Sequence, residues 1–537
     1  MTLAVIFTPL DWFWTIAYLI LLIGCGVLFY RLGKRSGADF FLAGRRLPWW
    51  LPASSVYATH TATDTPMWVS GVIYMHGLRG IWYTFFAAWC AVSAFVSTRI
   101  FRRSLVYSHA EWQSLRFGGL GGELMRGWIA GWQVFMNMFI AGWVGIAMGK
   151  VCAYVFGWHV WVGMVLFSSL CAIYTLAAGY WGVVASEFQQ GVIMFVTILI
   201  VSVWGIMVAG GPSGIVSKLT EMGEGWRLDP FAFTGWFSGD FPIAWFVTMI
   251  VIAFVGGLGM GTTIDWYVEA QRIQSAKTVR DASYAIWSGT ALVLTRNAVW
   301  AVAILGFYVM FPDIKDQADF EMAWFRLGFD YLPAGMVGFF FAGIVAIHVS
   351  SVAGILNLGA LYATRDIYHH YINPQASDRK LILVGRLSTL GILLGSFVYG
   401  SMMQEITKWL IFALWIMMAG IWLPNILQVI WWRFNAWGAL ASWIANLGIS
   451  WLVVWILPEF GIIPVLPDYL QFWILMALGA AVFIPVVYLT PAEDMEHLVQ
   501  YYVRARPAGW WKPVREEAER RGLLDTRENN LSAKGAS

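Results

Sequence analysis

The sequence predicts an all-α membrane protein with about thirteen transmembrane helices, its N-terminus outside and its C-terminus inside. Three observations support this prediction. Of the 537 residues, 59% are hydrophobic and only 12% are charged, which leaves too little polar surface for a water-soluble protein of this size. Apolar runs long enough to cross a bilayer recur about thirteen times, and Lys and Arg gather in alternate connecting segments.

The apolar runs define the candidate spans. They lie near 11–30, 49–73, 79–100, 127–154, 159–179, 188–210, 241–264, 284–311, 332–362, 381–402, 406–431, 435–457 and 469–490. No basic region and no small-residue cleavage site accompany the first run, so we expect a retained span and not a signal peptide. The four cysteines lie inside apolar runs, where we expect them to pack as small residues.

The positions of Lys and Arg set the predicted orientation. If the spans alternate, 25 of the 34 Lys and Arg residues fall on one side and 7 on the other, while Arg296 and Arg386 lie within spans. Cytoplasmic loops are the ones enriched in these residues, and the short loops show the same bias as the C-terminal tail. Residues 1–490 are therefore predicted to form a membrane transporter domain. Residues 491–537 are predicted to be a cytoplasmic tail, a solvated helix with a frayed end.

Two spans contain stretches that do not suit a continuous membrane helix. The span 49–73 carries YATHTATDTP, in which Pro66 removes a backbone donor and favours an interruption just before it. The span 241–264 carries GGLGMGTT. Irregular backbone at membrane depth usually lines protein or a cavity, although glycines also serve close helix packing. We expect both helices to be broken.

The two broken spans are five apart in the chain. They therefore occupy matching positions in two five-helix halves, spans 2–6 and spans 7–11. Since each half has an odd number of spans, the halves have opposite orientation. This is the inverted-repeat arrangement in which discontinuous helices form a binding site near the membrane midplane.

Ionisable groups near the breaks are candidate ligands for a solute. His60 and Asp64 are one helical turn apart, and Arg296 lies near mid-depth of its span, where a charge is costly and functional by default. The guanidinium can hold a carboxylate through two bonds, and Asp64 can hold an ammonium group or hydroxyls. The alternative is an internal pairing of Arg296 with Asp64 or with backbone carbonyls.

Five segments carry a family resemblance. They are DFFLAGRRLPWW (39–50), SHAEWQSLRFGG (108–119), GYWGVVASEFQQGVIM (179–194), AQRIQSAKTVRDA (270–282) and HVSSVAGILNLGALYATRDIYHHY (348–371). In this order they resemble the sodium:solute symporter family, the group of sodium-coupled sugar, proline, pantothenate and sialic acid transporters. The resemblance implies the leucine-transporter-type fold of two inverted five-helix repeats, with extra helices at both ends.

The resemblance also implies a sodium site between the first broken span and the ninth span. Its ligands would be the backbone carbonyls of Ala58, Thr61 and Ile347 and the hydroxyls of Ser350 and Ser351. A small hard cation needs several oxygen ligands, and neutral dipoles supply them while leaving release easy. The alternative for the two serines is a bond back to carbonyls one turn earlier in their own helix.

Glu187 falls where the family usually carries Asp, a position that the resemblance links to sodium release. The alternative is a carboxylate paired with a nearby base. In the solute pocket, Gly259 and Thr262 align where the sugar carriers place an Asn and a gating Tyr, and Thr65 aligns with their Gln. A sugar-carrier type of pocket is therefore not supported. An amino acid or another polar zwitterion would suit the ionisable groups.

The function predicted is a sodium-coupled secondary active symporter that imports a small polar organic solute by alternating access. We expect a multi-pass protein of the cell (plasma or inner) membrane, with the sodium ion, the solute and the lipid bilayer as partners, no cofactor and no nucleic acid. The alternatives are a transporter-like solute sensor and a proton-coupled symporter that uses His60 and Asp64. An enzyme is not expected, because neither HExxH nor GxSxG occurs and no large cytoplasmic domain follows.

Overall fold

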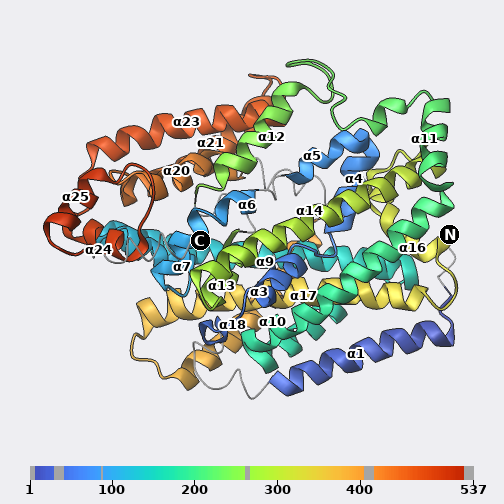
Figure 1. Cartoon of the computed structure of the whole chain (residues 1–537), viewed down its shortest axis with the longest axis horizontal. Helices are drawn as coiled ribbons and strands as arrows, with labels where there is room; N and C mark the ends of the chain where they lie inside the picture. The colour runs from blue at the N-terminus through green and yellow to red at the C-terminus, as the bar shows by residue number, and fades with distance from the viewer. Residues whose placement is uncertain (1–5, 30–41, 86–88, 260–265, 404–416, 525–537) are drawn as a thin grey trace.

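The computed structural model describes residues 6–29, 42–85, 89–259, 266–403 and 417–524, which form helices and no β-sheet (Figure 1). The first half of the chain forms α1 (Pro9–Phe29), η1 (Ala43–Arg45), α3 (Trp50–Thr59), α4 (Thr65–His76), η2 (Gly77–Gly80), α5 (Ile81–Thr84), α6 (Trp89–Ser93), α7 (Ser97–Ser104), α8 (His109–Arg116), α9 (Gly119–Phe156), α10 (Val160–Val208), α11 (Gly211–Glu221), η4 (Gly225–Leu228) and α12 (Ile243–Gly256). The second half forms α13 (Trp266–Ser275), α14 (Val279–Met310), α15 (Gln317–Glu321), α16 (Ala323–Tyr331), α17 (Val337–Leu361), η5 (Tyr362–Ile372), α18 (Asp378–Ser401), α20 (Met417–Ile430), α21 (Ala436–Trp451), η7 (Leu452–Ile456), α22 (Leu457–Glu459), α23 (Asp468–Leu489), α24 (Met495–Ala505) and α25 (Lys512–Arg520).

Most predicted spans correspond to an apolar helix. Seven helices in the described ranges are long and apolar enough to cross a membrane, and four shorter apolar helices accompany them. Together they match every predicted span except 49–73 and 79–100, which are divided into short helices. The division of 49–73 was predicted.

The division of 79–100 was not predicted, and the expectation of one continuous span there was wrong. The backbone leaves helical geometry at Val96, with φ −116° and ψ −83°. The Ser93 hydroxyl lies 2.9 Å from that of Ser97 and 3.2 Å from that of Thr98. Hydroxyl groups that bond to one another and to neighbouring backbone stabilise such an interruption inside an apolar segment.

The helix α10 contains both the fifth and the sixth predicted spans. A straight helix of 49 residues would be about 73 Å long, more than twice the apolar thickness of a bilayer. Its two ends lie close together, because Tyr154, just before α10, donates to Asp330 and Trp204, near its end, donates to the carbonyl of Tyr331. The chain therefore reverses direction within α10, as two antiparallel spans require.

Segments predicted to lie on the same side of the membrane contact one another. At the end of the molecule that carries α24 and α25, here called the tail end, Arg102 donates to the carbonyl of Ala276 at 2.9 Å (Figure 1). At the opposite end, Tyr74 donates to the carbonyl of Phe311 at 2.5 Å. Each of these two contacts joins segments that the predicted alternation places on the same side.

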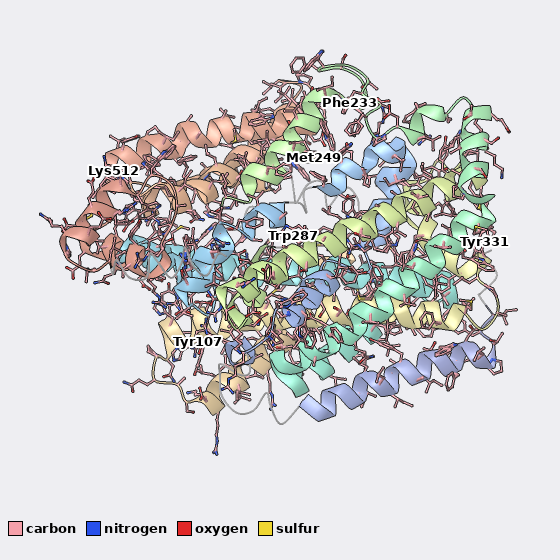
Figure 2. The ribbon with its side chains drawn as sticks, in the orientation of Figure 1. Tyr107, Phe233, Met249, Trp287, Tyr331 and Lys512 are labelled. Atoms are coloured by element: carbon pink, nitrogen blue, oxygen red, sulfur yellow. The ribbon has the colours of Figure 1, made fainter. Side chains whose placement is uncertain are left out.

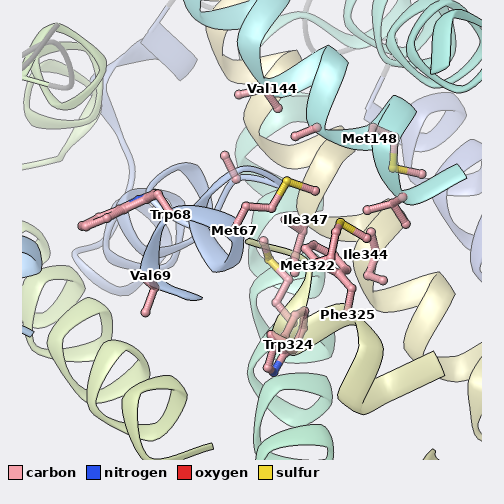
Figure 3. Packing of buried hydrophobic residues seen from close by; sticks show 14 of the residues in the cluster. Met67, Trp68, Val69, Val144, Met148, Met322, Trp324, Phe325, Ile344 and Ile347 are labelled. Atoms are coloured by element: carbon pink, nitrogen blue, oxygen red, sulfur yellow. The ribbon is translucent and has the colours of Figure 1, made fainter. Parts of the chain in front are cut away.

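The main apolar core surrounds the first broken span. Figure 3 shows Met67 of α4 beside Ile347 and Ile344 of α17, with Met148 of α9 and Trp324 of α16 close by. All five side chains are at most 1% exposed. Between membrane helices such side chains stabilise the contact by van der Waals packing, because the surrounding lipid is itself apolar. The core thereby fixes α4 against α17, the two helices expected to border the sodium site.

The tail packs against the rest of the protein over α24, whereas the solvated helix predicted for the segment that begins at Glu516 is present in α25, where Glu516, Glu519 and Arg520 are exposed. Lys512 marks the start of α25 at the tail end in Figure 2, opposite Tyr331. The side chains of Leu498, Tyr501 and Trp511 are at most 2% exposed, and they join the apolar cluster beneath α7 and α8. In the helices α24 and α25 the charged residues lie on one face and the apolar residues on the other.

Arg116, at the end of α8, anchors this packing. It is fully buried and donates to the carbonyls of Gln428 (2.7 Å), Trp431 (3.0 Å) and Phe434 (2.9 Å). Its guanidinium also lies 4.8 Å from the ring centroid of Trp511. Burial lowers the pKa of Arg116 to about 10, so the group stays charged at neutral pH.

Candidate functional site

The first broken span is interrupted where the sequence predicted. The helix α3 ends at Thr59 and α4 begins at Thr65, with Pro66 in its first turn. The Thr65 hydroxyl accepts a bond from the backbone N–H of Ala62 at 3.0 Å, and Thr65 N–H donates to the carbonyl of Ala62 at 3.0 Å. Thr65 therefore closes the turn that links the two half-helices, which satisfies backbone groups freed by the break.

In the second span that was predicted to be broken, the helix ends at the first of the glycines. The helix α12 stops at Gly256, and the carbonyl of Gly257 accepts a bond from the Ser97 hydroxyl at 3.3 Å. At Gly259 a Cβ atom would lie 2.9 Å from the carbonyl oxygen of Asn425. This glycine permits close approach of the break to α20. Thr262 lies outside the described residues.

Of the two serines of α17, Ser351 faces the first break. The Ser351 hydroxyl lies 3.4 Å from the carbonyl oxygen of Thr61 and 3.5 Å from that of Thr59. The Ser350 hydroxyl is buried and has no hydrogen-bond partner among the described residues. Neither hydroxyl bonds back to a carbonyl one turn earlier, so that alternative was wrong.

Among the residues predicted to hold sodium, Ser351 and Thr61 lie in contact across α17 and the break. All are nearly or fully buried: Ala58, Thr61, Ile347, Ser350 and Ser351. The Ala58 carbonyl accepts the backbone N–H groups of Thr61, at 3.2 Å, and of His60. The carbonyl of Thr59, which also faces Ser351, was not among the predicted ligands.

The Arg296 side chain forms hydrogen bonds with residues of the break. Its Nη1 donates to the carbonyl of His60 at 2.7 Å and to the hydroxyl of Thr61. Its Nε and Nη2 donate to the side-chain oxygen of Asn297 at 3.0 and 2.8 Å. Of the two roles that the sequence left open, the structure shows the internal pairing with carbonyls.

His60 has a different ionisable neighbour from the one considered. Its Nε2 lies 2.8 Å from a carboxylate oxygen of Glu269 on α13, and the Glu269 side chain is fully buried. The contact joins the end of α3 to α13. Asp64, at the first residue before α4, is 6% exposed. Glu269 was missed because more than 200 residues separate it from His60.

Glu187 is buried and paired with a base. Its carboxylate accepts bonds from Nη2 of Arg272 at 3.0 Å and from the hydroxyl of Thr59 at 3.3 Å, and it also accepts from the Ser55 hydroxyl. Arg272 in turn donates to Ser55 at 2.9 Å and to Thr59 at 2.8 Å. Both charged side chains are 0% exposed. The predicted alternative, a carboxylate paired with a nearby base, is confirmed.

The two clusters share one residue and lie next to each other. The Thr59 carbonyl faces Ser351, whereas its hydroxyl lies between Arg272 and Glu187. On α17, a Cβ atom at Gly354 would lie 3.0 Å from Nη2 of Arg272 and 3.3 Å from the Glu187 carboxylate. Gly354, three residues after Ser351, has no side chain and therefore leaves space for the ion pair.

Known proteins resemble this chain in sequence. A model described as the sodium:solute symporter family matches residues 40–446. The sodium/glucose cotransporter of Vibrio parahaemolyticus is 24% identical over 401 residues, which cover 70% of this chain and 71% of the relative. The high-affinity proline transporter PutP of Bacillus subtilis is 24% identical over 431 residues, covering 78% of this chain and 86% of the relative.

Solved structures resemble it in fold. A Na+-coupled sialic acid symporter in a substrate-bound, outward-open state aligns with a TM-score of 0.73 at 17% identity, covering 91% of this chain and all of that chain. Mhp1, a nucleobase-cation-symport-1 family transporter in a closed conformation, aligns with a TM-score of 0.52 at 12% identity, covering 87% and 98%. The all-α, leucine-transporter-type fold predicted from the sequence is thereby confirmed.

Proposed function

The chain belongs to the sodium:solute symporter family, and on this basis we propose that it is a sodium-coupled symporter that imports a small polar organic solute by alternating access. The proposed location is the cell membrane, with the tail end in the cytoplasm. The excess of Lys and Arg in the loops at the tail end supports this orientation.

One observation carries the sodium assignment. Ser350 has a buried hydroxyl without a hydrogen-bond partner, and Ser351 directs its hydroxyl at carbonyls of the break. A buried polar group without a partner costs about 1–3 kcal/mol, so its retention calls for a ligand. Carbonyl and hydroxyl oxygens from a broken helix and its neighbour are what a small cation needs to replace its water.

The proposed release route runs toward the tail end past Glu187. Thr59 offers its carbonyl to the sodium side and its hydroxyl to Glu187, so a cation that leaves Ser351 in this direction meets that carboxylate next. In this structure the route is closed. The buried pairs His60–Glu269 and Glu187–Arg272 hold α3 to α13 and α10. Their separation is the step that alternating access requires on this side.

The proposed solute site lies beside the break. Asp64 and Thr65 are its central candidates, together with His60 and the segment that holds Gly259 and Thr262. Arg296 is bound to the backbone, and a carboxylate such as that of Asp64 can hold an ammonium group or hydroxyls. We propose a solute with an ammonium group or several hydroxyls.

Sodium would stabilise the arrangement that binds solute from outside. Coupling of this kind requires only that the ion bind one arrangement better than the other, and the solute then raises the affinity for sodium by the same factor. Closing of the break around both ligands would precede separation of α3 from α13.

Uptake into proteoliposomes tests this function. Under an inward sodium gradient, a panel of radiolabelled amino acids, polyols and amines is expected to give at least one solute that accumulates. A proton gradient without sodium should give none. Binding without accumulation would indicate a solute sensor, and accumulation under the proton gradient alone would indicate the proton-coupled alternative that uses His60 and Asp64.

Thermal unfolding in detergent tests the site itself. A ligand that binds only the folded state raises the midpoint, by an amount equivalent to about 2.7 kcal/mol at 100 times its Kd. We expect sodium chloride to stabilise the wild type relative to potassium chloride and to have no such effect on Ser351→Ala. Ser396→Ala is the control, because the Ser396 hydroxyl is equally buried but donates to the carbonyl of Leu393.

A further inference from the structure

Three consecutive carbonyls at the first break point toward two different helices. Those of Thr59 and Thr61 face the Ser351 hydroxyl on α17, whereas that of His60 accepts a bond from Arg296 on α14. The break is thus held between the two helices. The residue that α14 supplies for this purpose carries a permanent charge.

The Arg296 guanidinium is fixed on three sides. Asn297 accepts from its Nε and Nη2, the break accepts from its Nη1, and the ring centroid of Trp300 lies 4.7 Å away. The residue is 2% exposed. A planar group whose plane and direction are both set can hold a peptide in one orientation, which a flexible ammonium group does less well.

Thr61 is tied by its side chain as well as by its position. Its hydroxyl accepts from Arg296 and donates to the carbonyl of Tyr57 at 2.7 Å. With the hydroxyl held between α3 and α14, the Thr61 carbonyl is left facing Ser351. The orientation of one proposed sodium ligand therefore depends on a side chain that does not itself face the sodium site.

We propose that Arg296 is a positioning residue of the sodium site: it holds the His60–Thr61 peptide so that the Thr61 carbonyl faces Ser351. This inference rests on the proposed function. It also assigns to Arg296 a role other than the binding of a solute carboxylate, because the donors of its guanidinium are directed at Asn297, His60 and Thr61.

Two effects of Arg296 on sodium have opposite signs and can be separated. Its positive charge repels a nearby cation, so removal of the charge alone would tighten sodium binding. Its planar guanidinium orients the Thr61 carbonyl, so loss of the planar group would weaken sodium binding. Arg296→Lys keeps the charge and loses the planar, multiply bonded geometry. The sign of its effect therefore distinguishes positioning from plain electrostatics.

The experiment measures the sodium concentration that gives half of the thermal stabilisation, with sodium chloride replacing potassium chloride at constant ionic strength. For Arg296→Lys we expect this concentration to rise at least about tenfold, as the loss of a charge-assisted hydrogen bond would produce. Asn297→Ala, which removes the acceptor that orients the guanidinium, should raise it by a smaller factor.

Arg116→Lys is the matched control. Arg116 is also a buried arginine that donates to three carbonyls and stacks on aromatic rings, but it lies at the tail end and away from the break. We expect this variant to lower the midpoint in potassium chloride and to leave the half-effective sodium concentration unchanged. If Arg296 only stabilised the fold, Arg296→Lys would likewise lower the midpoint in potassium chloride and leave the half-effective sodium concentration unchanged.

The outcomes separate the inference from the function on which it rests. If Arg296→Lys binds sodium as tightly as the wild type or more tightly, the positioning role is wrong while the sodium site stands. If sodium does not stabilise the wild type, the proposed function fails first. Should Arg296→Lys not fold, Asn297→Ala decides, and an unchanged half-effective concentration there overturns the proposal.

Discussion

The guanidinium of Arg272 and the carboxylate of Glu187 form an ion pair of 3.0 Å in which both side chains are completely buried. The pair joins α13 to α10, and the hydroxyls of Ser55 and Thr59 tie both charges to α3. The helices α3, α10 and α13, which separate in the proposed alternating access, are therefore connected by a single polar cluster.

Removal of one partner of this pair should be strongly destabilising. A buried charge left without its partner costs about 3–5 kcal/mol, so we expect Glu187→Gln and Arg272→Gln each to lower the unfolding midpoint markedly. The double variant should cost less than the sum of the two. Glu519→Gln is the control, since its pair with Arg515 is exposed, and its midpoint should not change. Additive single effects would contradict the pairing.

Glu269→Gln should loosen the tail-end closure. The pair of His60 with Glu269 links the end of α3 to α13, and loss of the charge weakens that link. We expect faster hydrogen–deuterium exchange of peptides covering α3 and α13, because local opening becomes less costly. Glu123→Gln alters an exposed pair with His370 and should leave those peptides unchanged. Equal exchange in both variants would mean that the contact does not hold the helices together.

Trp511→Ala should destabilise the protein although the residue lies in the tail. Trp511 is 2% exposed, and its indole N–H donates to the carbonyl of Val429 at 2.8 Å. Loss of a buried Trp side chain typically costs about 3–5 kcal/mol. The neighbouring Trp510 is 63% exposed, so Trp510→Ala serves as the control and should shift the unfolding midpoint little. A solvated tail would give the same small shift for both variants.

Gly259→Ala should be harmful for steric reasons. The added Cβ would lie 2.9 Å from the Asn425 carbonyl oxygen and 3.0 Å from the Ile426 nitrogen, both backbone atoms of α20. Overpacking of this kind costs about 1–3 kcal/mol. Gly391→Ala in α18 meets nothing within 4 Å and should be neutral or slightly stabilising, as judged from the unfolding midpoints. Equal midpoints would show that the second break can shift away from α20.

Much of the architecture was accessible from sequence because lipid imposes simple rules. A span must be apolar and long enough, so the spans are visible as runs, and irregular backbone is tolerated at depth only where protein or a cavity receives it. The break before Pro66 and the interruption at Gly256 followed from those rules. The division of 79–100 did not, because Ser93 and Ser97 are small and leave the run apolar.

The sequence by itself determined the class of protein, the family and the broken helices, because each depends on composition or on a local motif. The tertiary structure alone decided which charges meet. His60 bonds to Glu269, Arg296 holds the break, and the tail packs around Arg116. The physical reason is that a buried charge must find a partner in three dimensions, and that partner can lie hundreds of residues away in the chain.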